Sequence, residues 1–269
     1  MRAVDMRAED LLPGHWISPT LRKGMAERLE RGAPATIVPV SEIPQAWLAR
    51  LSAPRAPIAG LDMQSPKIMG ILNVTPDSFS DGGAHLAVSD ALSAAHRMHA
   101  AGAGLLDVGG ESTRPGAEFV PEDTEIARTA PVIEALRAEI PLPVSIDTRK
   151  LAVARAAVRA GAALVNDVSG LTFDAGLAPF CGKAGLPVCV MHAQGDPATM
   201  QDAPHYDNVL LDVYDFLSDR VDALGREGIP RDHIVVDPGI GFGKTMDHNL
   251  ALLRGLSLFH GLGCPILLG

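Results

Sequence analysis

The sequence lacks the features that mark nucleic-acid-binding, secreted or membrane-spanning proteins. It has 23 Lys and Arg against 32 Asp and Glu, a formal net charge of −9. The basic residues form no block, so we expect no nucleic-acid partner. No apolar run approaches the ~18 residues that a membrane span needs. The first ten residues contain acids and no apolar core, so they are not a signal peptide. We expect a cytoplasmic protein without a membrane partner.

Cysteine is scarce, and metal-site spacings of His and Cys are absent. Cys181, Cys189 and Cys264 are an odd number, form no C-x-x-C pair and lie in apolar stretches. This is typical of buried reduced thiols. His192 has no second ligand at a metal-site spacing. We interpret it as a hydrogen-bonded histidine at the end of a strand and not as a zinc ligand.

One pattern repeats from Lys67 onward. A short run rich in β-branched residues or leucine ends in a polar residue, and a loop with Gly or Pro leads to an Ala/Leu-rich stretch. This alternation indicates βαβ units and a parallel sheet. The expected strands are 68–74, 105–109, 144–147, 164–168, 188–191, 234–237 and 266–269. The expected helices are 89–101, 124–139, 151–160, 207–226 and 248–259.

The placement of polar residues favours a barrel over an open, doubly wound sheet. In a (β/α)8 barrel the C-terminal ends of the strands converge on one face, where the active site is built. In an open sheet they are spread along an edge. We therefore predict the α/β class and a (β/α)8 TIM barrel. The polar residues that end the expected strands are Asn73, Asp107, Asp147, Asn166, His192 and Asp237.

The expected strands number seven, and the chain ends at Gly269 directly after an apolar run. We therefore expect a partial sequence, with the eighth strand and the last helices of the barrel missing. Residues 1–66 lie outside the pattern; 21–31 fits one helix, and 53–66 is a Pro/Ala-rich linker. We expect an N-terminal appendage and linker at 1–66, packed on the exterior, and an incomplete barrel domain at 67–269.

Three loops have the composition of a binding site. Residues 73–83 follow a strand directly and fit either a surface turn or a mobile lid. Residues 109–116 contain Arg114, whose guanidinium can offer two parallel donors to a phosphate or carboxylate. Because the net charge opposes anions at long range, a phosphate site must be local. Residues 237–244 are rich in glycine but lack the Walker spacing of a P-loop.

Asp147, Asn166 and Asp237 are each more often a helix cap or a hydrogen-bond partner of a loop. Together they suit an amino-pyrimidine ring, because a carboxylate accepts two parallel N–H bonds and an amide both donates and accepts. A pterin or a purine is the ligand class that this set favours. Most methionines are expected in the core, although Met191, at a strand end, is placed to pack on a flat ring.

The three loops together resemble dihydropteroate synthase. The long matching segments are Met69-Gly-Ile-Leu-Asn-Val-Thr-Pro-Asp-Ser-Phe-Ser-Asp-Gly-Gly83 and Asp107-Val-Gly-Gly-Glu-Ser-Thr-Arg-Pro-Gly-Ala117, followed by 144–148, 165–170, 191–192 and 237–244. The resemblance implies a pterin-binding (β/α)8 barrel and a Mg²⁺-assisted transferase of folate and tetrahydrofolate biosynthesis. Such an enzyme condenses 6-hydroxymethyl-7,8-dihydropterin diphosphate with 4-aminobenzoate, giving 7,8-dihydropteroate and diphosphate.

The resemblance also implies roles residue by residue. Asn73 matches the metal ligand that binds Mg²⁺. Asp147 and Arg114 match the catalytic groups: Arg114 would offset charge on the diphosphate, and Asp147 would stabilise a pterin cation. A homodimer is one possible oligomeric state, which the sequence does not decide. The residues implied to bind substrate are Thr113, Arg114, Asp147, Asn166, Met191, Asp237, Phe242, Phe79 and Asp81.

The sequence departs from the family pattern at both ends. A Ser-Arg-Lys segment and a later Arg-x-His, which meet pterin and diphosphate in the family, do not occur up to Gly269, and the start of 66 residues is unusually long. Two alternatives stay open. The first is the pterin-binding barrel of a corrinoid-dependent methyltransferase, which loops 73–83 and 109–116 disfavour. The second is a truncated chain that binds pterin weakly and is inactive.

Overall fold

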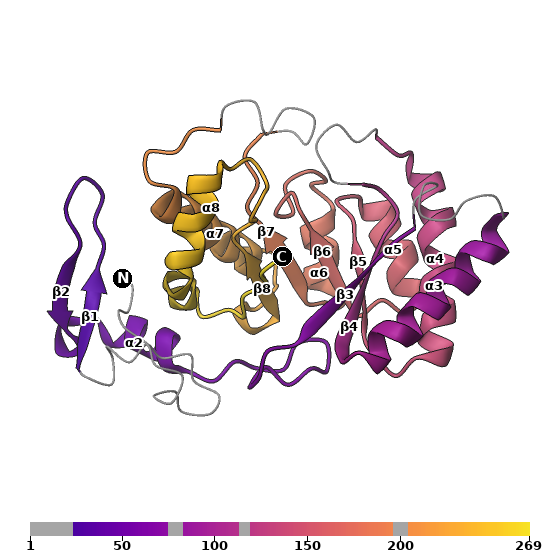
Figure 1. The fold of residues 1–269 in the computed structure, drawn as a ribbon, viewed down its shortest axis with the longest axis horizontal. Coiled ribbons are helices and arrows are strands. Elements are labelled where there is room, and N and C mark those ends of the chain that lie inside the picture. The colour runs from indigo at the N-terminus through magenta and orange to yellow at the C-terminus, as the bar shows by residue number, and fades with distance from the viewer. Residues whose placement is uncertain (1–23, 75–82, 113–118, 196–203) are drawn as a thin grey trace.

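The centre of the molecule is a sheet of six parallel strands (Figure 1). The computed structural model describes residues 24–74, 83–112, 119–195 and 204–269. Each strand pairs with the next strand in sequence, so the described sheet has no reversal of order of the kind that defines a doubly wound fold. The order is that of a half-barrel and confirms the α/β class. The strands are β3 (Ile68–Asn73), β4 (Ala103–Gly109), β5 (Val144–Asp147), β6 (Leu164–Asp167), β7 (Val188–Met191) and β8 (Ile234–Asp237).

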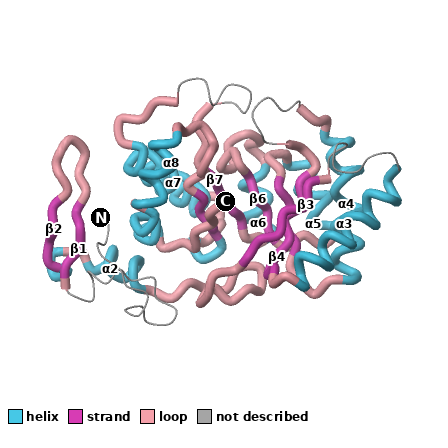
Figure 2. Tube along the Cα trace, in the orientation of Figure 1, coloured by secondary structure: helices cyan, strands magenta, loops and turns pink. Residues whose placement is uncertain are grey.

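Helices alternate with these strands along the chain (Figure 2). The helix predicted at 248–259 is divided into an α-helix and a 3-10 helix. The helix at Leu177–Ala184 was not predicted, because Pro179 and Gly182 lie among its eight residues and weaken the helical pattern. The helices are α3 (Gly83–Ala100), α4 (Glu122–Glu139), α5 (Leu151–Ala160), α6 (Leu177–Ala184), α7 (Val209–Arg226) and α8 (Met246–Arg254), with 3-10 helices η4 (Arg231–His233) and η5 (Leu256–Leu262).

The strand predicted at 266–269 is not a strand in the structure, and that prediction was wrong. Ile266 forms only an isolated parallel bridge with Val236. Two backbone hydrogen bonds hold the segment: Val236 N donates to Pro265 O at 3.0 Å, and Leu267 N donates to Val236 O at 2.9 Å. Two bonds around one residue align the segment with β8 but are too few to extend the ladder.

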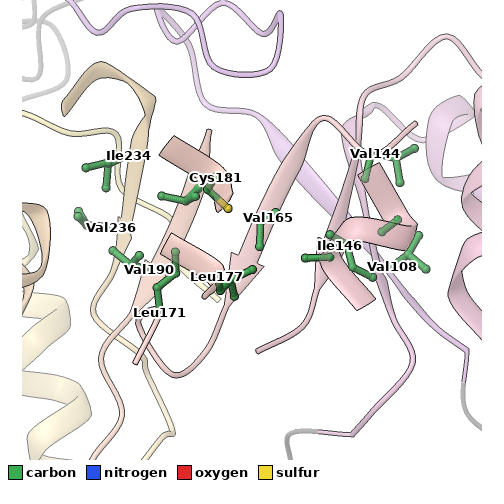
Figure 3. Packing of buried hydrophobic residues seen from close by; sticks show 14 of the residues in the cluster. Val108, Val144, Ile146, Val165, Leu171, Leu177, Cys181, Val190, Ile234 and Val236 are labelled. Atoms are coloured by element: carbon green, nitrogen blue, oxygen red, sulfur yellow. The ribbon is translucent and has the colours of Figure 1, made fainter. Parts of the chain in front are cut away.

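The two faces of the sheet carry different side chains because strand residues alternate in direction. Val108, Ile146, Val165, Val190 and Val236 are fully buried among the helices in the main core (Figure 3). The residues between them point to the inner face, which is polar toward the C-terminal ends of the strands. The valines and isoleucines of the sheet therefore fix its backbone, and that backbone positions the polar side chains.

The N-terminal region contains a small antiparallel hairpin of β1 (Met25–Arg28) and β2 (Thr36–Pro39), followed by η2 (Val40–Glu42) and α2 (Gln45–Ser52). The single helix predicted at 21–31 is therefore wrong over its described part. Gly24 and Gly32 both have positive φ and flank β1, which ends a helical path and allows the chain to turn back.

This region contacts the sheet and helices at several places. Ile58, within the predicted linker, is 3% exposed and packs with Leu164 and Cys189 on the inner face of the sheet. Arg31 forms ion pairs with Asp212 and Asp215 of α7 at 2.5 and 2.6 Å. Residues 53–66 are therefore more than a linker, because the side chain of Ile58 packs against the inner face of the sheet.

Two predictions made from the composition can be compared with the described residues. Cys181, Cys189 and Cys264 are buried and free, as predicted. None of the helices in the described ranges is long and apolar enough to cross a membrane.

Candidate functional site

The C-terminal ends of β3 to β6 form one row across the sheet. Asn73 pairs with Gly109, Gly109 with Asp147, and Asp147 with Asn166. A Cβ built on Gly109 would lie 3.4 Å from Asn73 Oδ1 and 3.6 Å from Asp147 Oδ2. The two oxygens therefore approach the same space beside Gly109, and the structure brings together three of the residues singled out in the sequence.

Asn166 is oriented by Asp107, a residue for which no function was predicted. Its Nδ2 donates to Asp107 Oδ2 at 3.0 Å, and Ser145 Oγ donates to Asp107 Oδ1. All three residues are buried. Because the amide group faces Asp107 with its nitrogen, its oxygen is directed to the other side as an acceptor. Asp107 was recognised only as a polar strand end, since pairing between adjacent strands is not visible in a single run of sequence.

Asp147 is an acid that resists ionisation. Burial raises its pKa well above the usual value, and repulsion from Asp107, Asp167 and other nearby carboxylates raises it further. A positive charge placed beside this carboxyl group would oppose both effects. The site at Asp147 therefore favours a ligand that is cationic or becomes cationic.

Asp237, at the end of β8, is buried and held by its own loop. Its Oδ1 accepts from Gly239 N at 2.7 Å. Burial raises its pKa to about 6, against the lowering effect of that hydrogen bond and of Lys244. At neutral pH Asp237 is thus mostly an anion that keeps acceptor capacity for a ligand.

The loops after β7 and β8 interlock closely. A Cβ on Gly239 would lie 2.0 Å from His192 O, and one on Gly243 would lie 2.5 Å from Gln194 O. Both glycines also have positive φ. These glycines allow contact between two backbones. The contact fixes the side chain of Met191, whose Cγ is 3.1 Å from the same Gly239 Cβ position.

His192 and Lys244 form a buried pair inside this interlock. Lys244 Nζ lies 3.0 Å from His192 Nδ1 and donates to His192 O at 3.1 Å and Phe242 O at 2.8 Å. Burial and the adjacent ammonium lower the pKa of His192 to about 3. His192 is therefore a neutral, hydrogen-bonded residue, as the sequence predicted.

A second buried lysine lies behind β5. Lys150 Nζ contacts Glu125 Oε2 at 2.7 Å, Glu111 Oε2 at 3.1 Å and Val120 O at 2.6 Å. Glu111 Oε1 also accepts from Val120 N at 2.9 Å. This cluster joins β4, α4 and the start of α5. No pattern in the sequence indicates this cluster beyond the polar residues themselves.

Several predicted site residues lie outside the described residues, namely Phe79, Asp81, Thr113 and Arg114. Met191 is buried and Phe242 is half-buried. Among the described residues no three His, Cys, Asp or Glu side chains gather in a metal-binding group. Asn73 is exposed and offers a hard oxygen. A single such oxygen suits Mg²⁺, which keeps several waters and takes further ligands from substrate phosphates.

A half-barrel of parallel strands, with buried acids and an oriented amide at its C-terminal rim, defines a small-molecule enzyme of the pterin-binding type. The family model described as pterin binding enzyme matches residues 69–269. The chain is 45% identical over 209 residues to the dihydropteroate synthase of Escherichia coli K12, an alignment that spans 78% of this chain and 74% of that protein.

Solved structures agree with this relationship. Dihydropteroate synthase of Xanthomonas albilineans with 4-aminobenzoic acid is 47% identical, with a TM-score of 0.72, covering 78% of this chain and 76% of that one. The same enzyme with 7,8-dihydropteroate has a TM-score of 0.67 at 44% identity, covering 76% and 72%. The chain belongs to the dihydropteroate synthase family.

Proposed function

We propose that the C-terminal rim of the sheet binds a pterin diphosphate and catalyses its condensation with 4-aminobenzoate. The products are 7,8-dihydropteroate and diphosphate, which makes the chain a transferase of folate biosynthesis. The observation that carries the proposal is the row of Asn73, Asp147 and Asn166, continued by Asp237 across the rim. Membership of the dihydropteroate synthases supports the same reaction.

In this proposal two strand ends recognise the amino-pyrimidine edge of the pterin. Asp237 accepts from the exocyclic amine and the adjacent ring N–H, since a carboxylate can accept two parallel bonds. Asn166, oriented by Asp107, presents its oxygen as a further acceptor. Met191, the last residue of β7, and Phe242, in the loop after β8, lie beside Asp237 and are placed to line the slot for the flat ring. This arrangement distinguishes a pterin from a ring without the amine.

Asn73 is the residue that would hold Mg²⁺, together with phosphate oxygens and water. The ion would supply positive charge to the departing diphosphate. Arg114 would share that task, and Thr113, Phe79 and Asp81 would complete the substrate contacts, as the resemblance implies. These four residues belong to the loops that carry the family's most specific segments.

Asp147 has the catalytic role of stabilising positive charge on the pterin. As the bond to diphosphate breaks, its electron pair leaves with the diphosphate and the pterin becomes cationic. The cation lowers the pKa of Asp147 against the raising effects of burial and of the neighbouring acids, so the carboxylate form becomes more favoured. The nitrogen lone pair of 4-aminobenzoate forms the new C–N bond to the cation, and the proton that the amine loses passes to the released diphosphate or to water.

Turnover and pterin affinity test the proposal separately. Asp147→Asn should lower kcat by about 100-fold, the scale seen when a group that stabilises charge in a transition state is removed. The exposed Asp123→Asn is the matched control. Arg114→Lys should lower turnover while pterin affinity stays unchanged, because a point charge replaces a bidentate donor. Normal turnover in Asp147→Asn would remove that residue from the reaction.

A further inference from the structure

Lys244 is a buried charge that the reaction described above does not use. It is 3% exposed, and its ammonium group donates to Phe242 O and His192 O and contacts His192 Nδ1. The three partners are all neutral. Burial lowers the pKa of Lys244 to about 7, and attraction to Asp237 opposes that shift. Burying an ammonium group costs free energy, because the group loses its hydration and needs compensating interactions in the interior.

The ammonium group of Lys244 is hydrogen-bonded to the backbone at or next to both ring-lining residues, Met191 and Phe242. One of its carbonyl partners belongs to Phe242, and the other belongs to the residue after Met191. Lys244 therefore bridges the backbones of the two loops that carry the ring-lining side chains. Tyr206 reinforces the bridge, since its hydroxyl donates to Gly243 O at 2.7 Å.

The remaining groups around Lys244 carry little charge of their own. His192 is neutral, with a pKa of about 3. Burial raises the pKa of Cys189 well above its usual range and that of Tyr206 to about 12, so both are neutral as well. Asp212 of α7 is anionic but is paired with Arg31 at 2.5 Å. The charge that acts on Lys244 from close by is that of Asp237.

We propose that Lys244 is a positioning residue for the pterin site: it sets the spacing between the loops of Met191 and Phe242 and supplies the positive charge that supports the Asp237 carboxylate. The proposal rests on the assignment of Asp237 to the pterin. It adds to that assignment a residue that does not touch the ligand. A pterin that needs an anion at Asp237 would then bind in a manner that depends on the charge of Lys244.

Two variants separate charge from spacing. Lys244→Gln keeps a donor for a carbonyl but removes the charge, and Lys244→Arg keeps the charge with a different shape. Lys183→Gln, at an exposed position on α6, is the matched control. The measurement is the affinity for pterin itself by calorimetry from pH 5 to pH 8.5, with a thermal melt of each variant.

In the wild type, pterin affinity should fall on the acid side as Asp237 is protonated near pH 6. Loss of a neighbouring positive charge disfavours the carboxylate, so this midpoint should move to higher pH in Lys244→Gln, with about tenfold weaker binding at pH 6.5. Lys244→Arg should keep the wild-type midpoint and lose affinity only through altered spacing. A role limited to packing would weaken binding equally at every pH.

The outcomes are distinguishable from failure of the proposed function. If Asp237→Ala binds pterin normally, the pterin site itself is wrongly placed. If Asp237→Ala loses binding but Lys244→Gln keeps both affinity and midpoint, only the role of Lys244 is overturned. Should Lys244→Gln not fold, Lys244→Arg still decides: a shifted acid midpoint in that charged variant would contradict the proposal.

Discussion

Lys150 and Lys244 are both buried behind the C-terminal rim of the sheet, with 1% and 3% of their surface exposed. Lys150 faces two carboxylates, Glu125 Oε2 at 2.7 Å and Glu111 Oε2 at 3.1 Å. Lys244 has hydrogen bonds only to neutral acceptors. The first lysine is balanced within its own cluster. Among the described residues no carboxylate is hydrogen-bonded to Lys244, so its charge acts on the surroundings, where Asp237 is the nearby acid. Burial of the same group thus stabilises a charge cluster at one end of the rim, and at the other end we propose that it supports ligand binding.

The largest effect on stability should follow from breaking the balanced cluster. Lys150→Met leaves Glu125 buried without its cation and leaves Glu111 only Arg149, whose Nε lies 3.4 Å from Glu111 Oε2. This should lower the free energy of unfolding by about 3–5 kcal/mol. Lys244→Met strands only neutral acceptors and should lower it by about 1–3 kcal/mol. Denaturant unfolding of the two variants side by side measures the difference. Equal losses would contradict the contrast between the two sites.

The pH dependence of stability should also reveal the buried ammonium group of Lys244. The pKa of Lys244 is lowered from 10.5 to about 7 in the folded state. Between these values the unfolded chain binds one more proton, so this group makes stability rise with pH from about 7 toward 10.5. Lys244→Met should lack that rise. Unfolding measured at pH 7, 8 and 9 tests this, and an unchanged slope in Lys244→Met would show that Lys244 titrates in its ordinary range.

A smaller effect should come from the hydrogen bond that orients the row. Ser145→Ala removes the hydroxyl that donates to Asp107, and should lower stability by about 1–3 kcal/mol because a buried acceptor loses a partner. Asn166 would also be less firmly oriented, so pterin affinity should fall slightly. Calorimetry and unfolding of the variant measure both effects. Ser145→Cys replaces the buried serine with a side chain of similar size and serves as a packing control.

The smallest effect is expected at the N-terminal hairpin. Arg31 binds Asp212 and Asp215, but Arg31 is exposed and solvent screens such pairs. Arg31→Ala should leave the melting temperature and turnover nearly unchanged. Trp47 is half exposed in the same region, so pterin should not shift its emission. A ligand-dependent shift, or a large loss of turnover in Arg31→Ala, would connect the hairpin to the site.

The sequence predicted the strands best where β-branched runs are short and bounded. The ranges 144–147, 188–191 and 234–237 agree with the structure, as does the convergence of their polar ends. The predictions for 21–31 and 266–269 were wrong, because pairing with another segment decides their structure: β1 pairs with β2 in a hairpin, and Ile266 makes only one bridge to β8. Interactions through space, such as those of Asp107 with Ser145 or of Lys150 with Glu125, have no periodicity in the sequence and were not predicted.

The assignment of Asp237 to the pterin is the claim on which the site and the role of Lys244 both depend. Calorimetry with pterin at pH 7.5 tests it directly, using Asp237→Ala and the exposed Asp232→Ala as a control. Loss of a charge-assisted hydrogen bond of about 1.5–3 kcal/mol should weaken binding at least tenfold. The control should bind as the wild type does. Unchanged affinity in a folded Asp237→Ala would contradict the account.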